Sequence, residues 1–238
     1  MSVSWRGKVL TVQVLFSRTS LATQILISAR KTALLLDCGD GTVRDLLEAG
    51  VTLDSLAGVF LTHGHADHLG GLWGLLGYLR AEGRTGPFGV WYPKGCEEVE
   101  KLMHAFLSAH AGSIPFQLST CPLVADEEIL VEEFRVQAWK VEHCHSVAGK
   151  LLGPTPAFGY RLEAGGEVVA YTGDTGPCPS LTELVRGADL ALIEASWEKQ
   201  GLAGLHLTRN QAEELGELAR RAFLIHRKDG VVVELGGV

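Results

Sequence analysis

The chain has 238 residues, 46% of them hydrophobic and 21% charged, and its formal net charge is −7; this size suits one domain with a sheet-based core, expected over residues 1–238. The acidic balance argues against a broad nucleic-acid-binding surface, although it leaves room for a local basic patch. No stretch approaches the ~18 apolar residues of a membrane span, and the start lacks the pattern of a signal peptide, so we expect a cytoplasmic protein without a membrane partner.

Strands and helices are mixed along the first half of the chain. The glycine-rich turn of "CGDGT" is expected to end a buried strand that begins at Thr32. Hydrophobic periodicity predicts further strands over residues 9–16, 24–29, 56–62 and 88–93, and helices over 42–49, 69–83 and 96–110.

The second half continues in the same manner. A helix is expected over residues 180–188, beginning at a Ser180 cap, and residues 148–157 are expected to form a loop that either roofs a site or is a plain surface loop. The remaining predicted elements are two or three strands between Phe116 and Val141, a hairpin of 157–163 with 167–174, strands over 189–196, 223–227 and 230–235, and a helix over 208–222. Such mixing predicts a layered α/β fold in which helices cover sheet faces.

The motif "HGHADH" directly follows the apolar strand at 56–62 and concentrates His63, His65, Asp67 and His68 in six positions. A core cannot hold these side chains unpaired, and a surface loop gains little from them. Imidazoles and carboxylates are the usual ligands of zinc and similar divalent ions. A loop at a strand end can turn residues 63 and 65 to one side and 67 and 68 to the other, which predicts two neighbouring metal sites.

Other apolar strands also end in potential ligands, as expected when strand ends converge on one rim. These further candidates are His143, His145, Asp174, His206 and His226. Any one of them alone could equally be a satisfied core or surface residue. His104 and His110 lie in a predicted helix with nothing to complement them, and we do not expect them to be ligands.

The motif "HGHADH" resembles the His-x-His-x-Asp-His signature of the metallo-β-lactamase superfamily. The segments "LLLDCGDGT", "YTGDTGPC", "LIEAS" with "HLT", and "FLIH" are similar to its other motifs, so the resemblance runs from about Leu34 to His226. Within the superfamily the chain is most similar to ribonuclease Z. The resemblance implies a four-layer αββα sandwich with metals at one edge of its two sheets.

The resemblance also implies a ligand set for two divalent cations, expected to be zinc, with manganese as the alternative. Metal one takes His63, His65 and His143, metal two takes Asp67, His68 and His226, and Asp174 bridges the two with a water or hydroxide between them. Asp67 is also expected among the catalytic residues. His145 stays open as an alternative to His143, because residues two apart on a strand face the same way.

Three further side chains have expected roles, and the resemblance implies the pairing of the first two. His206 is expected to donate a proton to the leaving oxygen, and Glu194 to orient it, unless Glu194 is an ordinary strand-end carboxylate. Asp37 is expected to hold a ligand histidine and fix its tautomer; an equal alternative is a turn carboxylate that bonds the "CGDG" backbone.

Two adjoining cations predict hydrolysis, since they stabilise both the attacking and the leaving oxygen. The ribonuclease Z likeness implies a phosphodiester at the 3′ end of tRNA precursors, or a smaller diester, and a homodimer. Two departures bear on substrate size. Only "AGGE" stands where the tRNA-binding arm should be, and the basic N-terminal loop retains a single Arg18. A small-molecule hydrolase of lactones, aryl sulfates or carboxylic esters therefore remains an alternative, and a non-catalytic metal-binding protein a third.

Overall fold

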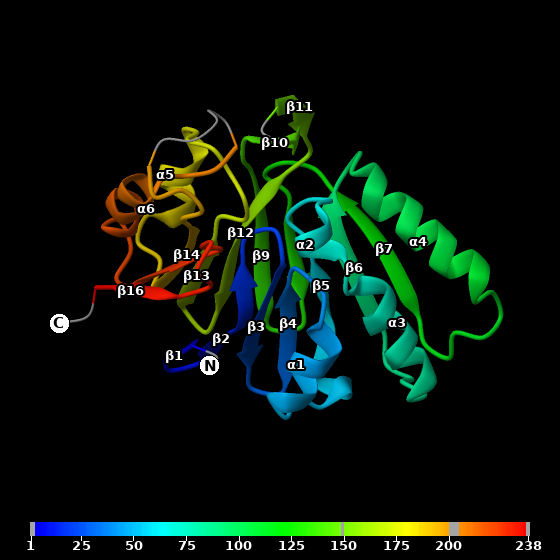
Figure 1. The fold of residues 1–238 in the computed structure, drawn as a ribbon. Coiled ribbons are helices and arrows are strands. Elements are labelled where there is room, and N and C mark those ends of the chain that lie inside the picture. Colours follow the sequence, from blue (N-terminus) through cyan, green and yellow to red (C-terminus); the bar gives the residue numbers. More distant parts are fainter. Residues whose placement is uncertain (1–2, 149, 200–204, 237–238) are drawn as a thin grey trace.

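Two seven-stranded sheets lie face to face in the computed structural model, which describes residues 3–148, 150–199 and 205–236 (Figure 1). The first sheet follows chain order and comprises β1 (Val3–Arg6), β2 (Leu10–Arg18), β3 (Ala22–Ala29), β4 (Thr32–Leu36), β5 (Leu56–Phe60), β6 (Phe88–Pro93) and β7 (Leu118–Leu123). The second sheet has the order β16 (Val233–Leu235), β15 (Ala222–Ile225), β14 (Leu190–Glu194), β13 (Glu167–Tyr171), β12 (Phe158–Ala164), β9 (Phe134–Lys140) and β8 (Glu128–Val131). A separate two-stranded hairpin consists of β10 (His143–Val147) and β11 (Lys150–Thr155).

Helices cover the outer face of each sheet. Those on the first sheet are α1 (Thr42–Glu48), α2 (Ala66–Leu69), α3 (Leu72–Ala81) and α4 (Glu97–Ala109), those on the second are α5 (Ser180–Val185) and α6 (Arg209–Gly216), and a 3₁₀ turn spans Leu53–Ser55. One apolar core lies between the sheets, and two further cores lie between each sheet and its helices. The predicted four-layer αββα sandwich is therefore confirmed. None of the helices in the described ranges is long and apolar enough to cross a membrane.

Strand β4 illustrates how an apolar run specifies this layering. Leu34 and Leu36 lie in the core between the sheets, whereas Leu35 packs into the core under the helices. Successive side chains of a strand point to opposite faces, so a strand with apolar cores on both sides is apolar at every position. A shift of one residue in its pairing would exchange the two faces.

Parallel strands place the candidate ligands at one edge of the molecule. Strands β4, β5, β6 and β7 run parallel to one another, and so do β13, β14 and β15. The carboxyl ends of parallel strands meet at the same edge of a sheet, where ligand sites of open α/β sheets are found. Asp37, His63, Asp174, Glu194 and His226 lie at or just beyond such strand ends.

Two predicted helices differ from the observed ones. The helix expected over 69–83 is interrupted, since α2 ends at Leu69 and α3 begins at Leu72. At this break the backbone N–H of Gly71 donates to the carbonyl of Cys38 at 2.8 Å, and a Cβ on Gly71 would lie 2.1 Å from the carbonyl oxygen of Gly39. The helix expected over 208–222 ends at Gly216, where a Cβ would lie only 3.1 Å from the side chains of Ala222 and Leu235.

Two other local predictions were wrong and one strand was missed, while the β12–β13 hairpin is confirmed. Helix α5 begins at Ser180 with Pro179 as its cap residue, because the Ser180 hydroxyl donates instead to the carbonyl of Lys140 at 2.6 Å. Much of the expected loop at 148–157 forms β11, which pairs with β10. Strand β1, not predicted, pairs antiparallel with β2 at the edge of the first sheet.

Candidate metal centre

Four of the candidate ligands come from one short stretch after β5. His63 and His65 lie in the loop, while Asp67 and His68 lie in α2, whose first turn follows the extended backbone of His65. His63 and His68 are fully buried. The change from extended chain to helix turns the two pairs toward two different sets of partners, as the spacing of the motif predicts.

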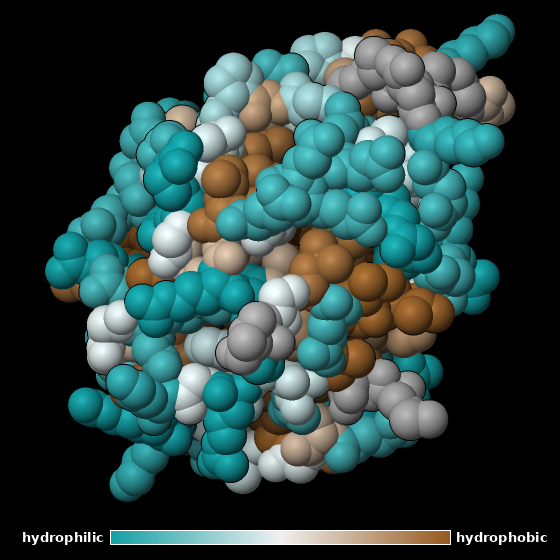
Figure 2. Space-filling view, turned by 90° about the vertical axis from the view of Figure 1, so that its left-hand side faces the viewer, coloured by the Kyte–Doolittle hydropathy of each residue, from teal (hydrophilic) through white to brown (hydrophobic). Residues whose placement is uncertain are grey.

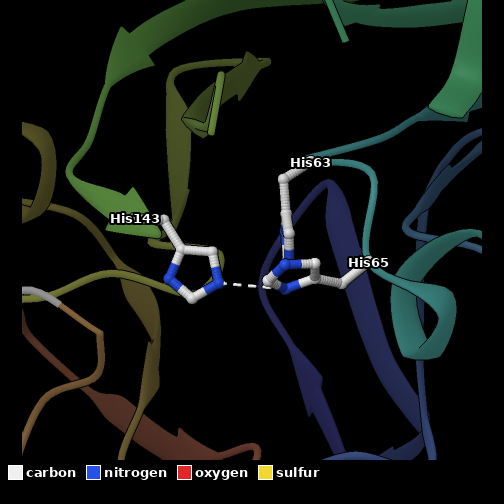
Figure 3. Close-up of side chains that lie close together, drawn as sticks. All are labelled: His63, His65 and His143. Carbon is white, nitrogen blue, oxygen red and sulfur yellow. Dashed lines mark hydrogen bonds between the residues drawn. The ribbon is translucent and has the colours of Figure 1, made fainter. Parts of the chain in front are cut away.

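The first set, here called the imidazole group, consists of His63, His65 and His143 (Figure 3). Their candidate ligand atoms all lie within 4.8 Å of one another. His143 comes from β10, nearly 80 positions away from the loop, and its Nε2 lies 3.1 Å from Nδ1 of His65. Three imidazoles at this spacing can offer three nitrogen ligands to one cation.

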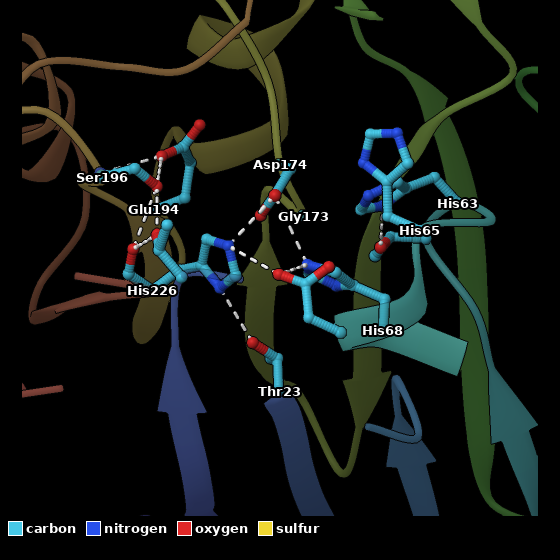
Figure 4. Close-up of polar contacts among 12 residues, drawn as sticks. Thr23, His63, His65, His68, Gly173, Asp174, Glu194, Ser196 and His226 are labelled. Atoms are coloured by element: carbon cyan, nitrogen blue, oxygen red, sulfur yellow. Dashed lines mark hydrogen bonds and ion pairs between the residues drawn. The ribbon is translucent and has the colours of Figure 1, made fainter. Parts of the chain in front are cut away.

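The second set, here called the mixed group, consists of Asp67, His68, Asp174 and His226. The last three of these are labelled in Figure 4. Oδ2 of Asp174 lies 3.3 Å from Nε2 of His68 and 3.1 Å from Nε2 of His226. Oδ2 of Asp67 lies 3.5 Å from the same nitrogen of His226 and accepts the backbone N–H of Ser20 at 2.8 Å. This group joins two carboxylates to two imidazoles.

The buried polar atoms of both groups fit metal coordination. Nε2 of His63, His68 and His226 and Oδ1 of Asp174 are buried without a hydrogen-bond partner among the described residues. Buried polar atoms are almost always satisfied, so several unsatisfied ones at one place need a reason. Nitrogen and carboxylate oxygen are the atoms that zinc binds, and a divalent cation at each group would satisfy them.

The other ring nitrogen of each buried imidazole is already occupied. Nδ1 of His63 lies 2.9 Å from the hydroxyl of Thr62, and Nδ1 of His226 lies 2.9 Å from the hydroxyl of Thr23. His143 donates through Nδ1 to the carbonyl of Leu205 at 2.8 Å. Such contacts fix the ring orientation and tautomer of metal-binding histidines, and here they direct Nε2 inward.

Asp37 performs the same task for His68. Its Oδ2 accepts from Nδ1 of His68 at 2.7 Å and from the hydroxyl of Tyr171 at 2.7 Å, and its Oδ1 accepts the backbone N–H of Thr62 at 2.8 Å. Asp37 and His226 both have positive φ, 57° and 54°. Non-glycine residues in this conformation are strained, and such strain clusters at functional sites.

The two groups have different electrostatics. Burial lowers the pKa of His63 well below its usual range and that of His143 to about 3, so both rings are neutral and keep a free lone pair. Burial also acts to lower the pKa of His68, but Asp174 and Asp37 raise it well above its usual range. The mixed group therefore attracts positive charge, which favours a cation there.

Glu194 and His206 form an ion pair beside the mixed group. Oε1 of Glu194 lies 3.0 Å from Nδ1 of His206, and that nitrogen lies 3.8 Å from Oδ2 of Asp174. Glu194 is fully buried and also accepts the backbone N–H groups of Thr175 and Leu207. Burial acts to lower the pKa of His206, but the Glu194 carboxylate raises it to about 9, which leaves the ring protonated at neutral pH.

His145 contacts the imidazole group from outside. Its Nδ1 lies 3.0 Å from Nε2 of His65, and it is not among the three residues whose ligand atoms converge. Of the two histidines that the sequence left open, His143 is the one placed within the group.

Comparison with known proteins places this geometry in a family. Residues 32–227 match the family model described as the beta-lactamase superfamily domain. The chain belongs to the metallo-β-lactamase superfamily. A relative named ribonuclease Z, from Methanosarcina acetivorans, is 26% identical over 255 aligned positions, which cover 88% of this chain and 83% of the relative.

Solved structures share this metallo-β-lactamase fold. The metallo-beta-lactamase fold protein YhfI from Bacillus subtilis superposes with a TM-score of 0.74 at 20% identity, covering 92% of this chain and 86% of that one. The short form of human tRNase Z gives 0.72 at 21% identity, covering 91% of this chain and 92% of that one. At these identities the likeness establishes the fold.

Several contacts of this metallo-β-lactamase site were absent from the sequence prediction. Tyr171 donates to Asp37, and Thr23 holds Nδ1 of His226, but neither residue stands in a ligand-like pattern. Tyr171 ends β13 three positions before Asp174 and could have been noticed there; Thr23 has no local signal. The contact between His145 and His65 was not predicted, because His143 and His145 were considered only as alternatives for a single ligand position.

Proposed function

We propose that this metal-dependent hydrolase cleaves phosphodiester bonds in the manner of ribonuclease Z, with two divalent cations as cofactors. The observation that carries the proposal is the pair of adjoining donor groups beside the protonated His206. Three nitrogens of these groups, Nε2 of His63, His68 and His226, are buried without a hydrogen-bond partner among the described residues. Relatives named ribonuclease Z that align over most of both chains support the phosphodiester class. We further propose that residues 1–238 act as one domain; a homodimer and a cytoplasmic location also remain predictions.

The proposed ligand set assigns one cation to each group. The imidazole group holds metal one, and Asp67, His68 and His226 hold metal two. Asp174 is proposed to bridge the two: its Oδ2 lies close to His68 and His226, and its Oδ1 has no hydrogen-bond partner within the described part of the chain. Zinc fits this nitrogen-rich donor set, and manganese is the alternative. When bound, two such cations would lower the pKa of a water molecule and offset the charge of a phosphate.

The side chains of the chain divide the remaining work. His206 carries the proton that the leaving oxygen requires, and Glu194 holds its Nδ1, which leaves Nε2 as the nitrogen that can donate. Asp67 is proposed among the catalytic residues, since its Oδ2 is fixed by the backbone of Ser20 and faces His226. Asp37 orients His68 through Nδ1.

Two features favour a small or loosely held substrate over a whole tRNA. Strands β12 and β13 are joined by a tight turn at Gly165 and Gly166, so no arm extends from this place. The net charge of −7 is unfavourable for a polyanion such as tRNA, whose binding requires several contacts between Lys or Arg side chains and phosphates. A precursor tRNA end and a smaller phosphodiester are therefore both proposed substrates, and a lactone, aryl sulfate or carboxylic ester is the second candidate class.

The test is a metal analysis followed by a substrate panel. We expect close to two equivalents of zinc or manganese per chain after loading and removal of excess metal. The loaded protein is then given a precursor tRNA, bis-p-nitrophenyl phosphate, and a panel of lactones and aryl esters. Turnover of the diester above that of the esters supports the proposal, and cleavage of the precursor at one position would identify tRNA. Turnover confined to lactones or esters would contradict it.

A further inference from the structure

We propose that His145 and Glu98 are positioning residues that hold the ring of His65 in the tautomer that binds a cation in the imidazole group. The inference rests on the proposed metal centre and is independent of the substrate.

His65 differs from the other imidazoles of the site in the nitrogen that it turns inward. His63, His143 and His226 are each held through Nδ1, which leaves Nε2 for a cation. In His65 the arrangement is reversed, because Nδ1 lies 3.1 Å from Nε2 of His143 while Nε2 lies 3.0 Å from Nδ1 of His145. His65 therefore needs its proton on Nε2, and His145 is the group placed to accept that proton's hydrogen bond.

Glu98 determines which nitrogen of His145 accepts. Its Oε1 lies 3.5 Å from Nε2 of His145. A carboxylate can only accept hydrogen bonds, so it favours the His145 tautomer with the proton on Nε2, and Nδ1 then carries the lone pair. That lone pair accepts from Nε2–H of His65 and leaves Nδ1 of His65 free to bind a cation. Carboxylate–histidine pairs of this kind raise the basicity of a metal ligand and fix its orientation.

The backbone is built to permit this approach. A Cβ on Gly64, between the two imidazoles of the loop, would lie 2.6 Å from Oε2 of Glu98 and 2.8 Å from Sγ of Cys96. Glycine at this position lets the first turn of α4 come close to the loop. On β10, alternation places His143 and His145 on the same face, so one strand supplies a candidate ligand and the residue that orients another.

The chain of contacts from Glu98 through His145 to His65, here called the relay, begins at the surface. Its two outer side chains, Glu98 and His145, can therefore be mutated without disturbing the core. The side chains of His145 and Glu98 are 36% and 41% exposed, so removing either leaves no buried cavity. This separates a positioning role from a contribution to the core.

The experiment measures metal affinity by competition of the full chain with a chromogenic chelator for zinc. In His145→Ala we expect the affinity of the imidazole group for its cation to fall about 10- to 100-fold. The affinity of the mixed group should not change. The visible spectrum of the cobalt-substituted protein should change. His145→Gln keeps an oxygen that can accept from His65 and is expected to restore most of the affinity. Glu98→Gln should weaken binding less, and should add nothing in the His145→Ala background.

The matched control is His104→Ala, which removes an exposed imidazole from α4 away from the site. Unchanged affinity and an unchanged cobalt spectrum in His145→Ala would overturn the relay while leaving the metal centre intact. Loss of the ion from His145→Gln as complete as from His145→Ala would also overturn it, since His145 would then be a ligand itself. A wild-type chain that binds fewer than two ions would overturn the metal centre and the relay together.

Discussion

The imidazole group and the mixed group lie side by side but offer a cation different environments. The imidazole group contributes three neutral rings, whose pKa values are all lowered by burial, and no carboxylate. The mixed group contributes two carboxylates, and its His68 is surrounded by enough negative charge to raise its pKa. Charge attraction falls with distance and is strong where water is excluded, so we expect the mixed group to bind its cation more tightly.

The comparison teaches that the two sites depend on different supports. The mixed group gains affinity from the charge of Asp67 and Asp174, whereas the imidazole group gains it from the orientation of neutral rings. Around the imidazole group that orientation comes from Thr62, the carbonyl of Leu205 and His145. Around the mixed group it comes from Asp37 and Thr23.

The largest effect is expected from Asp174→Ala, which should weaken cation binding at both groups alike. If the carboxylate bridges both cations, the variant loses most of both, from about two equivalents to below about one, and turnover disappears. Metal analysis of the purified variant, with circular dichroism to verify the fold, provides the measurement. Retention of one full equivalent would mean that Asp174 serves the mixed group alone.

His206→Ala should separate proton donation from metal binding. We expect both cations to remain and kcat to fall by about 10²–10⁴, the usual contribution of a general acid. Steady-state kinetics on bis-p-nitrophenyl phosphate together with metal analysis measure the two effects. If the variant loses a cation, His206 is a ligand, and the assignment of its role is wrong.

Asp37→Asn should act chiefly on the mixed group, although Asp37 also accepts from the Thr62 hydroxyl that contacts His63. The amide cannot accept equally well from His68, Thr62 and Tyr171, so the affinity of the mixed group should fall by about 10- to 100-fold. The control is Asp40→Asn, an exposed carboxylate in the same turn. Competition with a chelator distinguishes the two variants; equal affinities would show that Asp37 is a turn carboxylate without influence on the metal.

The smallest effects are expected from Thr23→Val and Thr62→Val, which keep the side-chain shape and remove a hydroxyl. Each deletes one hydrogen bond to a ring Nδ1, worth at most about tenfold in affinity. Thr23→Val should weaken the mixed group, and Thr62→Val chiefly the imidazole group, although its hydroxyl also contacts Asp37. Two-site zinc titrations resolve the difference, and identical titrations for both variants would argue against separate supports.

The fold was predictable because its signals are local and repeated. Apolar strands such as β4 and β14 are buried on both faces, and their composition alone identifies them. Helix limits were less predictable, because the break before α3 lies where Gly71 approaches the backbone of Gly39, and α6 ends where Gly216 approaches the side chains of Ala222 and Leu235. Such contacts depend on the tertiary structure, so hydrophobic periodicity does not predict them.

The same division holds for the candidate site. His63, His65, Asp67 and His68 are identified by their density in one motif, and Asp174 and His226 by their place after apolar strands. The contact of Thr23 was not predictable, since a lone threonine in a strand is common in any sheet, and its role appears only when the ring of His226 is in place. Tyr171 could have been noticed from its place three positions before Asp174, but its hydrogen bond to Asp37 depends on the tertiary structure.

The sequence by itself determined the chemistry of this protein: the type of each donor, the apolar strands that carry them, and the superfamily that they indicate. Only the tertiary structure decided the pairing, namely that His143 enters the imidazole group while His145 contacts His65 from outside. The physical reason is that alternation along a strand gives both histidines the same direction. The two histidines differ in how they meet His65, which lies in a loop some 80 positions earlier in the chain. That arrangement depends on how the loop and β10 pack together, and the sequence pattern does not specify it.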